Sequence, residues 1–182
     1  MRSLRLASLA LAATFALPSV AHADLRLGGD GKRVERKGFM VGLSLLPGMM
    51  RSGKSFAPAM RFRYALGGGV HEAVTLATEF GVHKPFGIKS KKIGFDVDVV
   101  ATGYIGRFFV RGGVGVTSWA YVAAKDPFKP GVGGLVGLGW EFPMGDKVGL
   151  GLGLDYDARV RPDGLLAQTV LFGLRVNAFP KK

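Results

Sequence analysis

The sequence predicts an all-β protein, a closed antiparallel barrel of eight up-and-down strands whose apolar face points outward into a membrane. Three observations lead to this fold class. Apolar residues recur at every second position, which is the side-chain period of an extended strand with two different faces. The opposite face carries Gly, Ala, Thr and a few charges, not the Lys, Gln and Ser of a solvated surface. After the N-terminal segment no apolar run is long enough for a membrane-spanning helix, so any transmembrane structure must be β.

Residues 1–23 have the three parts of a cleavable signal peptide. Arg2 and Arg5 give a positive first region, LASLALAATFAL is the apolar region, and an Ala-His-Ala motif supplies the cleavage pattern. We expect Asp24 to be the first residue of the mature chain. A retained anchor helix is the alternative, but the apolar stretch is too short for a bilayer core of about 30 Å. The chain is therefore expected to be exported.

Composition limits the chemistry of the exported chain. It has no cysteine, so disulfides and thiolate metal sites are excluded. The formal net charge is +12. Outside the cytoplasm a basic protein is expected to meet phosphate-bearing lipid or glycan, and no motif of a nucleic-acid-binding fold is present. We therefore expect no nucleic-acid partner.

The strands are expected to follow one another along a single barrel domain, residues 38–179. Residues 24–37 are polar and charged and predict a flexible periplasmic leader, and residues 180–182 form a basic tail. Tight and longer connections alternate, which is typical of outer-membrane barrels and places both termini on the short-turn side. The predicted strands are 38–46, 57–67, 73–83, 92–104, 107–122, 132–142, 147–158 and 165–179.

The two faces of the strands differ enough to orient the barrel. Leu150, Leu152 and Leu154 alternate with glycines, and Asp155 and Asp157 continue the glycine face. Glycine and compact charges suit a narrow lumen in which large side chains do not all fit. We therefore predict that the apolar face points outward and the polar face inward.

Charged residues on the compact face are predicted to meet inside the barrel. Arginine is the only cation among them, and its planar fork suits buried carboxylates. Because buried charges must be paired whatever the function, ion pairing is favoured over acid–base catalysis by the carboxylate pairs. The predicted network is Arg61, Arg63, Glu79, Asp96, Asp98, Arg111, Glu141, Asp155, Asp157 and Arg175.

Two further sets of residues are predicted to contact lipid. Four aromatic residues near strand ends on the apolar face predict an interfacial girdle, with ordinary sandwich packing as the alternative. Ten basic residues in or beside the longer loops are expected to bind lipopolysaccharide phosphates, unless they serve only solubility and anchoring. The girdle is Phe108, Trp140, Phe142 and Tyr156. The basic set is Arg51, Lys54, Lys84, Lys89, Lys91, Lys92, Lys125, Lys129, Arg159 and Arg161.

From Gly38 to Phe179 the chain resembles the small eight-stranded outer-membrane barrels of Gram-negative bacteria, with the architecture of the OmpA-type transmembrane domain. The signal peptide, the alternation and the strand count carry this resemblance. It implies the outer membrane as location and the outer-membrane assembly machinery as a partner. Such barrels often end on a lipid-facing aromatic residue, whereas Phe179 shares the parity of Arg175 and Asn177. Either a bulge shifts the register or the assembly signal is atypical.

The sequence offers little for catalysis. His71 and His83 are the histidines that follow the signal peptide, and no spacing motif joins them into a metal site. We expect both to be solvated, His71 in a short turn and His83 at a loop base. A barrel resembling a lipid A deacylase would need a Ser–His pair at the outer rim, for which His83 and Ser90 are the only candidates. We expect no enzyme, metal or cofactor.

Together these observations predict a monomeric outer-membrane barrel with a closed, ion-paired lumen. Its function would be to stabilise the envelope or to present basic extracellular loops to lipopolysaccharide or a partner. A narrow pore for small solutes is the first alternative, although eight strands leave a lumen only wide enough for side chains. A lipid-modifying enzyme is less favoured. At the level of the fold, a soluble lipocalin-like carrier is the alternative.

Overall fold

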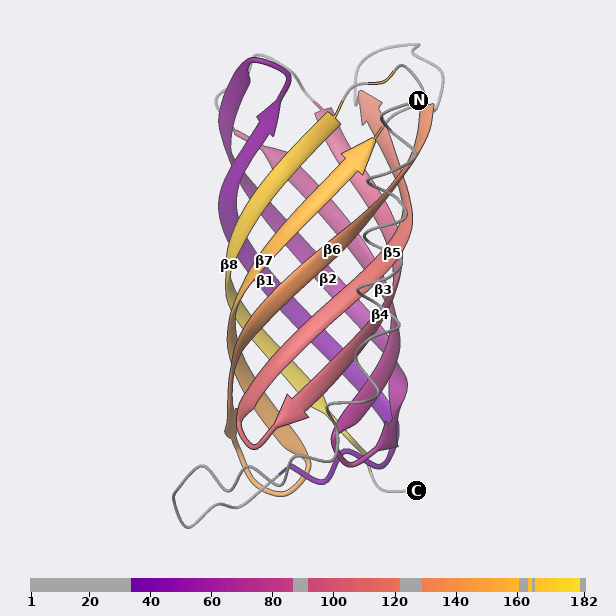
Figure 1. Ribbon diagram of the computed structural model, residues 1–182, viewed down its shortest axis with the longest axis vertical. Coiled ribbons are helices and arrows are strands. Elements are labelled where there is room, and N and C mark those ends of the chain that lie inside the picture. Colours follow the sequence, from indigo (N-terminus) through magenta and orange to yellow (C-terminus); the bar gives the residue numbers. More distant parts are fainter. Residues whose placement is uncertain (1–33, 87–91, 122–128, 161–163, 165, 181–182) are drawn as a thin grey trace.

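Eight antiparallel strands form a closed barrel in the computed structural model, in which β1 pairs with β2 and also with β8 (Figure 1). The structure describes residues 34–86, 92–121, 129–160, 164 and 166–180. The predicted barrel is confirmed, while the predicted signal peptide and residues 24–33 of the leader lie outside the described residues. The strands are β1 (Gly38–Ser52), β2 (Ser55–His71), β3 (Val74–Pro85), β4 (Lys92–Ile105), β5 (Phe108–Tyr121), β6 (Lys129–Pro143), β7 (Val148–Val160) and β8 (Leu166–Ala178).

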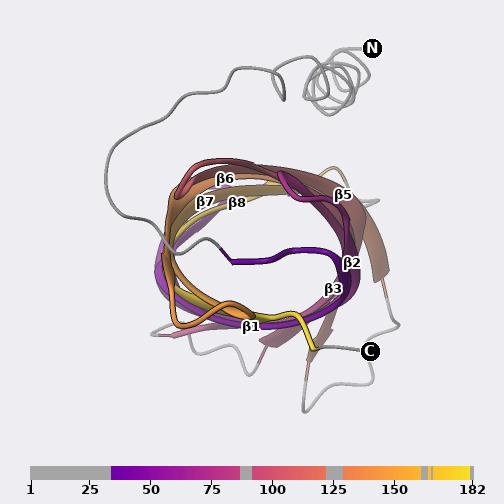
Figure 2. The ribbon, with the colours of Figure 1, turned by 90° about the horizontal axis from the view of Figure 1, so that it is seen from below.

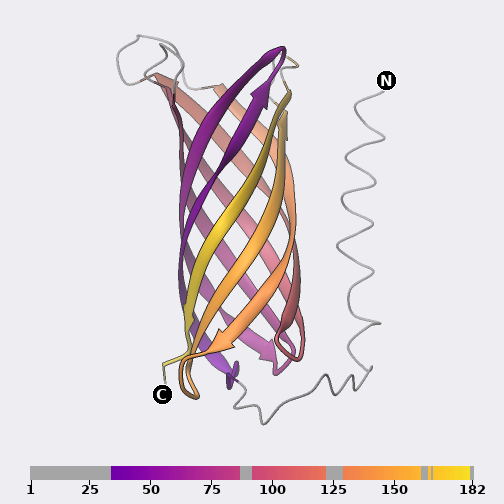
Figure 3. The ribbon, with the colours of Figure 1, turned by 90° about the vertical axis from the view of Figure 1, so that its left-hand side faces the viewer.

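The barrel has two distinct ends (Figure 3). The terminal end is where β1 begins and β8 ends, and it carries the turns β2–β3, β4–β5 and β6–β7. The loop end is the opposite one. Figure 2 looks onto the terminal end and shows the first described residues lying across the opening of the barrel.

The connection between β1 and β2 is shorter than predicted. Residues 47–56, between the first two predicted strands, were expected to form a long loop, but both strands continue to a two-residue turn at Gly53 and Lys54, where Gly53 has a φ of 60°. β1 passes through Pro47 although this residue has no N–H to donate. The β1–β8 pairing lapses at Leu46 and Pro47 and resumes in the same register at Gly48. The prediction of a loop here is wrong.

Large apolar side chains cover the outer wall of the barrel. Val99, Leu154 and Phe172 are all exposed, as are their counterparts on the other strands. The alternate positions point inward and are mostly small or charged, with a few large apolar residues such as Leu46, Val100 and Leu171 among them. The predicted sidedness is therefore confirmed, and the exposed apolar surface far exceeds what a soluble monomer normally shows. Among the described residues there is no helix long and apolar enough to cross a membrane.

Candidate functional site: the charged lumen

Within the described chain, six arginines and six carboxylates are buried, and all lie on the lumen side of the wall or at its terminal end. All ten residues of the predicted network are among them. The prediction missed two arginines, Arg36 and Arg159. The missing residues could have been inferred, because six predicted carboxylates stood against only four arginines and buried charges need partners.

The loop-side cluster comprises Arg61, Arg159, Asp96, Asp98 and Asp157. Asp157 accepts hydrogen bonds from Arg61 (Nη1 to Oδ2, 2.7 Å) and from Arg159 (Nε to Oδ1, 2.9 Å). Arg159 also binds both oxygens of Asp98, each at 2.7 Å. Asp96 is more loosely held, 3.7 Å from Nε of Arg61. These contacts join β2, β4 and β7 across the lumen.

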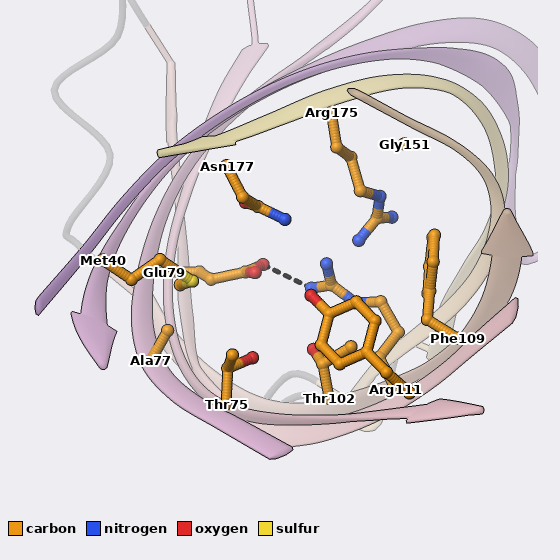
Figure 4. Close-up of a pocket in the computed structure, with 11 residues that line it drawn as sticks. Met40, Thr75, Ala77, Glu79, Thr102, Phe109, Arg111, Gly151, Arg175 and Asn177 are labelled. Atoms are coloured by element: carbon orange, nitrogen blue, oxygen red, sulfur yellow. Dashed lines mark hydrogen bonds and ion pairs between the residues drawn. The ribbon is translucent and has the colours of Figure 1, made fainter. Parts of the chain in front are cut away.

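The middle cluster comprises Arg63, Arg111, Arg175, Glu79 and Asp155. Asp155 accepts from Arg63 (Nη1 to Oδ2, 2.8 Å) and from Nη2 of Arg175. Glu79 accepts from Arg111 (Nη2 to Oε2, 2.5 Å) and lies 3.6 Å from Arg63. Figure 4 shows Glu79, Arg111 and Arg175 pointing from different strands into the same space. The cluster fills the middle of the barrel.

Glycines on the inner face make room for these carboxylates. A Cβ atom at Gly81 would lie 2.1 Å from Oδ2 of Asp96, and one at Gly137 would lie 2.1 Å from Oδ1 of Asp155. The glycine alternation that indicated a narrow lumen therefore has a direct steric cause. The space that remains is small: a cavity of about 20 Å³ beside Glu79 and Arg175, enough for about one water molecule.

Residues 34–36, the N-terminal strap, close the terminal end of the lumen. The guanidinium of Arg36 pairs with Glu141 and lies 3.7 Å from the centroid of the Tyr104 ring. Its Nη1 also donates to the carbonyl oxygen of Glu72 (3.3 Å). Residues 24–37 were predicted to form a flexible leader. The contacts of Arg36 correct this prediction for residues 34–36, which are held against the barrel. Arg36 is held against the barrel wall because its guanidinium forms the ion pair with the buried carboxylate of Glu141.

Backbone and side-chain contacts hold the strap in place. The N–H of Glu35 donates to the carbonyl oxygen of Asp146 (2.8 Å), and Lys147 forms an ion pair with the Glu35 carboxylate. Next to the strap, Nζ of Lys37 lies 2.9 Å from Oε1 of Glu72, and this hydrogen bond raises the pKa of Lys37. The strap is thus attached to two turns of the terminal end.

Phe179 points into the barrel. It is fully buried and packs with Val34, Met40, Ala65 and Ala77. Its N–H donates to the carbonyl oxygen of Lys147 (2.8 Å), so the chain stays on the wall beyond the end of β8. The parity expected from the sequence is kept and no bulge turns this aromatic outward. It closes the terminal end together with the strap.

Arg159 was predicted in the basic loop set, and that prediction is wrong. β7 extends to Val160, so Arg159 keeps the inward parity of Asp155 and Asp157 and is buried. A strand that ended at residue 158, as predicted, would have left this residue in a loop.

The other nine residues of the basic set fall into three groups: exposed side chains, residues whose side chains are not described, and residues outside the described chain. Arg51 at the end of β1, Lys54 in the turn and Lys84 in β3 are exposed at the loop end. Lys92 and Lys129 begin strands, but their side chains are not described. The remaining four, Lys89, Lys91, Lys125 and Arg161, lie outside the described residues.

The four girdle residues lie on the outer wall. Trp140, Phe142 and Tyr156 are exposed and Phe108 is half-buried. Phe108 pairs in register with Trp140 near the terminal end. The hydroxyl of Tyr156, nearer the loop end, accepts a hydrogen bond from Gln168 (2.7 Å). An interfacial role for these side chains stays a prediction.

His83 is not at a solvated loop base, as predicted, but inside the barrel. It lies within β3, is almost fully buried, and its Nδ1 is 3.2 Å from Nη2 of Arg61. The strand continues two residues beyond His83, which leaves the imidazole on the lumen face, away from any lipid at the outer wall. Its suggested partner Ser90 lies outside the described residues. His71 is exposed in the turn region, and the described chain holds no group of three or more potential metal ligands.

The fold defines the class of this protein as a small eight-stranded β-barrel of the outer-membrane type. Neisserial surface protein A (NspA) has a similar crystal structure, with a TM-score of 0.63 at 14% identity over 78% of this chain and 97% of that chain. Ail of Yersinia pestis (TM-score 0.49, 10% identity, 78% and 99% covered) and OprG of Pseudomonas aeruginosa (0.46, 8%, 81% and 99%) also match. At these identities the likeness concerns the fold. No family model and no curated protein sequence matches the chain.

Proposed function

We propose that this chain is an outer-membrane barrel without catalytic activity, whose lumen is closed by ion pairs and whose basic loop end binds anionic lipid. The observation that carries the proposal is an arrangement opposite to that of a soluble protein. In the described part of the chain, large apolar side chains lie outside and twelve charged residues are buried inside. A closed barrel leaves no unpaired strand edge, as a hydrocarbon surrounding requires. An apolar band around such a barrel is the lipid contact of outer-membrane proteins.

The lumen contacts support a closed barrel over a pore. Arg61 of β2 reaches Asp157 of β7, and Arg159 of β7 reaches Asp98 of β4, so the pairs connect strands that are not neighbours. The strap and Phe179 cover the terminal end. A solute would have to break several buried ion pairs to pass.

The exposed cations at the loop end support lipid binding. The guanidinium of Arg51 lies 5.5 Å from the ring centroid of Phe56, and Nζ of Lys84 lies 5.8 Å from that of Phe86. Each cation is therefore held at the edge of the apolar wall, where the phosphates of a lipid would lie. Lys and Arg bind such phosphates through charge-assisted hydrogen bonds.

Membrane location and barrel closure are tested together. The full chain is expressed in a Gram-negative host, the envelope is fractionated, and gel mobility is compared with and without heating. We expect recovery in the outer membrane and a heat-dependent change in mobility. A protein that is soluble without detergent would overturn the proposal. In planar bilayers we expect no steady conductance, and steady conductance would overturn the closed lumen.

Lipid binding is tested with lipopolysaccharide in detergent micelles. The triple variant Arg51→Ala, Lys54→Ala, Lys84→Ala is expected to lose affinity several-fold. The control is the variant Lys37→Ala, Arg107→Ala, which removes two exposed cations of the terminal end, the second in the turn between β4 and β5, and which should bind as the wild type does. Equal binding by the triple variant would remove the lipid role. The absence of catalysis is checked separately by mass spectrometry of lipid A, which should be the same with wild type and His83→Ala.

A further inference from the structure

We propose that the lumen cavity is a binding site for a small monovalent anion, a single halide ion. The cavity lies in the middle cluster and has a volume of about 20 Å³ (Figure 4). Its lining includes Arg111, Arg175, Thr75, Thr102 and Asn177. All of these side chains carry hydrogen-bond donors.

The middle cluster has an excess of positive charge. Three arginines stand against the carboxylates Glu79 and Asp155. The opposite excess lies in the loop-side cluster. Among the described residues one long ion pair joins the two clusters, from Nη2 of Arg63 to Oδ2 of Asp157 (3.4 Å). Arg175, which lines the cavity, has Asp155 as its single ion-pair partner within the described residues. An anion bound in the cavity would neutralise the excess positive charge of the middle cluster where it arises, beside Arg175.

Two nitrogen atoms of the Arg175 guanidinium, beside the cavity, lack a hydrogen-bond acceptor in the described chain. Nη2 donates to Asp155, but Nε and Nη1 are buried and have no hydrogen-bond partner among the described residues. Figure 4 shows the guanidinium pointing into the cavity. Glu79 is the one carboxylate in the lining, and its Oε2 already accepts from Arg111 at 2.5 Å. The buried side-chain atoms of the lining that lack a hydrogen-bond partner in the part of the chain that the structure describes are therefore donors, Nε and Nη1 of Arg175 and Nε of Arg111, which suits an anion.

The size of the cavity selects among anions. A volume of about 20 Å³ holds one occupant of the size of a water molecule. Chloride and bromide are single atoms somewhat larger than a water molecule, whereas sulfate, phosphate and carboxylates have several heavy atoms and need more space. Water is the competing occupant, and the positive excess favours the halide over it.

Gly151 provides a way to fill the cavity without changing a charge. A Cβ atom there would lie 3.4 Å from Cε1 of Phe109 and 3.5 Å from Cβ of Arg175, which is ordinary contact. Gly151→Ala is therefore expected to fold and to occupy part of the space. Gly103→Ala is the matched control, because Gly103 lies on the outer wall and its nearest neighbouring atom would be 3.9 Å away.

The experiment uses bromide, whose anomalous scattering separates it from water. Crystals of the full mature chain grown in bromide should show an anomalous peak beside Arg175, lost in Gly151→Ala and kept in Gly103→Ala. In solution, replacing gluconate by chloride at constant ionic strength should raise the Tm of wild type and Gly103→Ala more than that of Gly151→Ala.

Three outcomes would overturn the proposal. The first is a cavity occupant without anomalous signal, which would be water. The second is a peak that appears only at molar bromide with no chloride effect on Tm, which would be an adventitious ion only. The third is an undiminished bromide peak and chloride effect in Gly151→Ala, which would place the ion elsewhere.

A second variant tests the same site through its donor. Arg175→Gln, where it folds, should lose the bromide peak as Gly151→Ala does.

Discussion

Arg159 and Asp98 form a two-point ion pair across the lumen, with Nη1 and Nη2 of the arginine each 2.7 Å from one carboxylate oxygen. Both side chains are almost fully buried. The residues lie on β7 and β4, 61 positions apart in the chain. Without Arg159, Asp98 would have no ion-pair partner among the described residues, so this arginine is required for charge balance in the loop-side cluster.

Arg159→Met should lower the free energy of unfolding by about 3–5 kcal/mol, because it leaves a buried carboxylate unpaired. The double variant Arg159→Met, Asp98→Asn should lose less than the sum of the single variants. Equilibrium urea unfolding in micelles measures both. The control Arg51→Met removes an exposed arginine and should change stability by no more than about 0.5 kcal/mol. Equal losses at Arg159 and Arg51 would contradict the importance of the lumen pair.

Gly69→Ala should release the N-terminal strap. An added Cβ would lie 1.2 Å from the carbonyl oxygen of Arg36, a backbone atom that can only move away. We expect trypsin to cleave after Arg36 and Lys37 faster in this variant than in the wild type. Gly103→Ala should leave the cleavage rate unchanged. The same rate in all three proteins would mean that the strap is not held at Gly69.

Leu154→Arg tests whether the outer wall faces hydrocarbon. Leu154 lies midway along β7 and is 45% exposed. An arginine there should cost about 2–4 kcal/mol in a bilayer. The control is Val70→Arg, also on the outer wall but close to the terminal end of β2, where the cost should be about 0–1 kcal/mol. Unfolding from lipid vesicles gives both values, and no dependence on depth would argue against a membrane-spanning wall.

Phe179→Ala should loosen the terminal end as well as destabilise the barrel. Removing a fully buried phenylalanine typically costs about 3–5 kcal/mol. Because Phe179 packs against Val34, we also expect faster tryptic cleavage after Arg36. The control Phe172→Ala changes an outward-facing ring of β8, the strand that precedes Phe179, and should leave that cleavage unchanged. If both variants were cleaved alike, Phe179 would not support the strap.

The sequence by itself determined the strands and their two faces. Leu152 and Leu154 alternate with Gly153 and Asp155, and this period of two depends only on neighbours along the chain. The size of the inward residues then indicated a narrow lumen, and all ten predicted lumen residues lie inside it. Local periodicity was enough for these conclusions because one face of each strand lines the lumen and the other faces outward along the whole strand.

Only the tertiary structure decided what happens at the ends of the strands. Whether Arg159 and His83 lie in loops or in the lumen depends on one or two more residues of strand. Where the strand continues past them, both side chains keep the inward parity of their neighbours and enter the lumen. The role of Arg36 depends on Glu141, 105 positions away, which comes near only when the barrel closes. Partners so distant in sequence leave no local pattern. The unequal count of carboxylates and arginines on the inner face was the one sign in the sequence that two cations were missing.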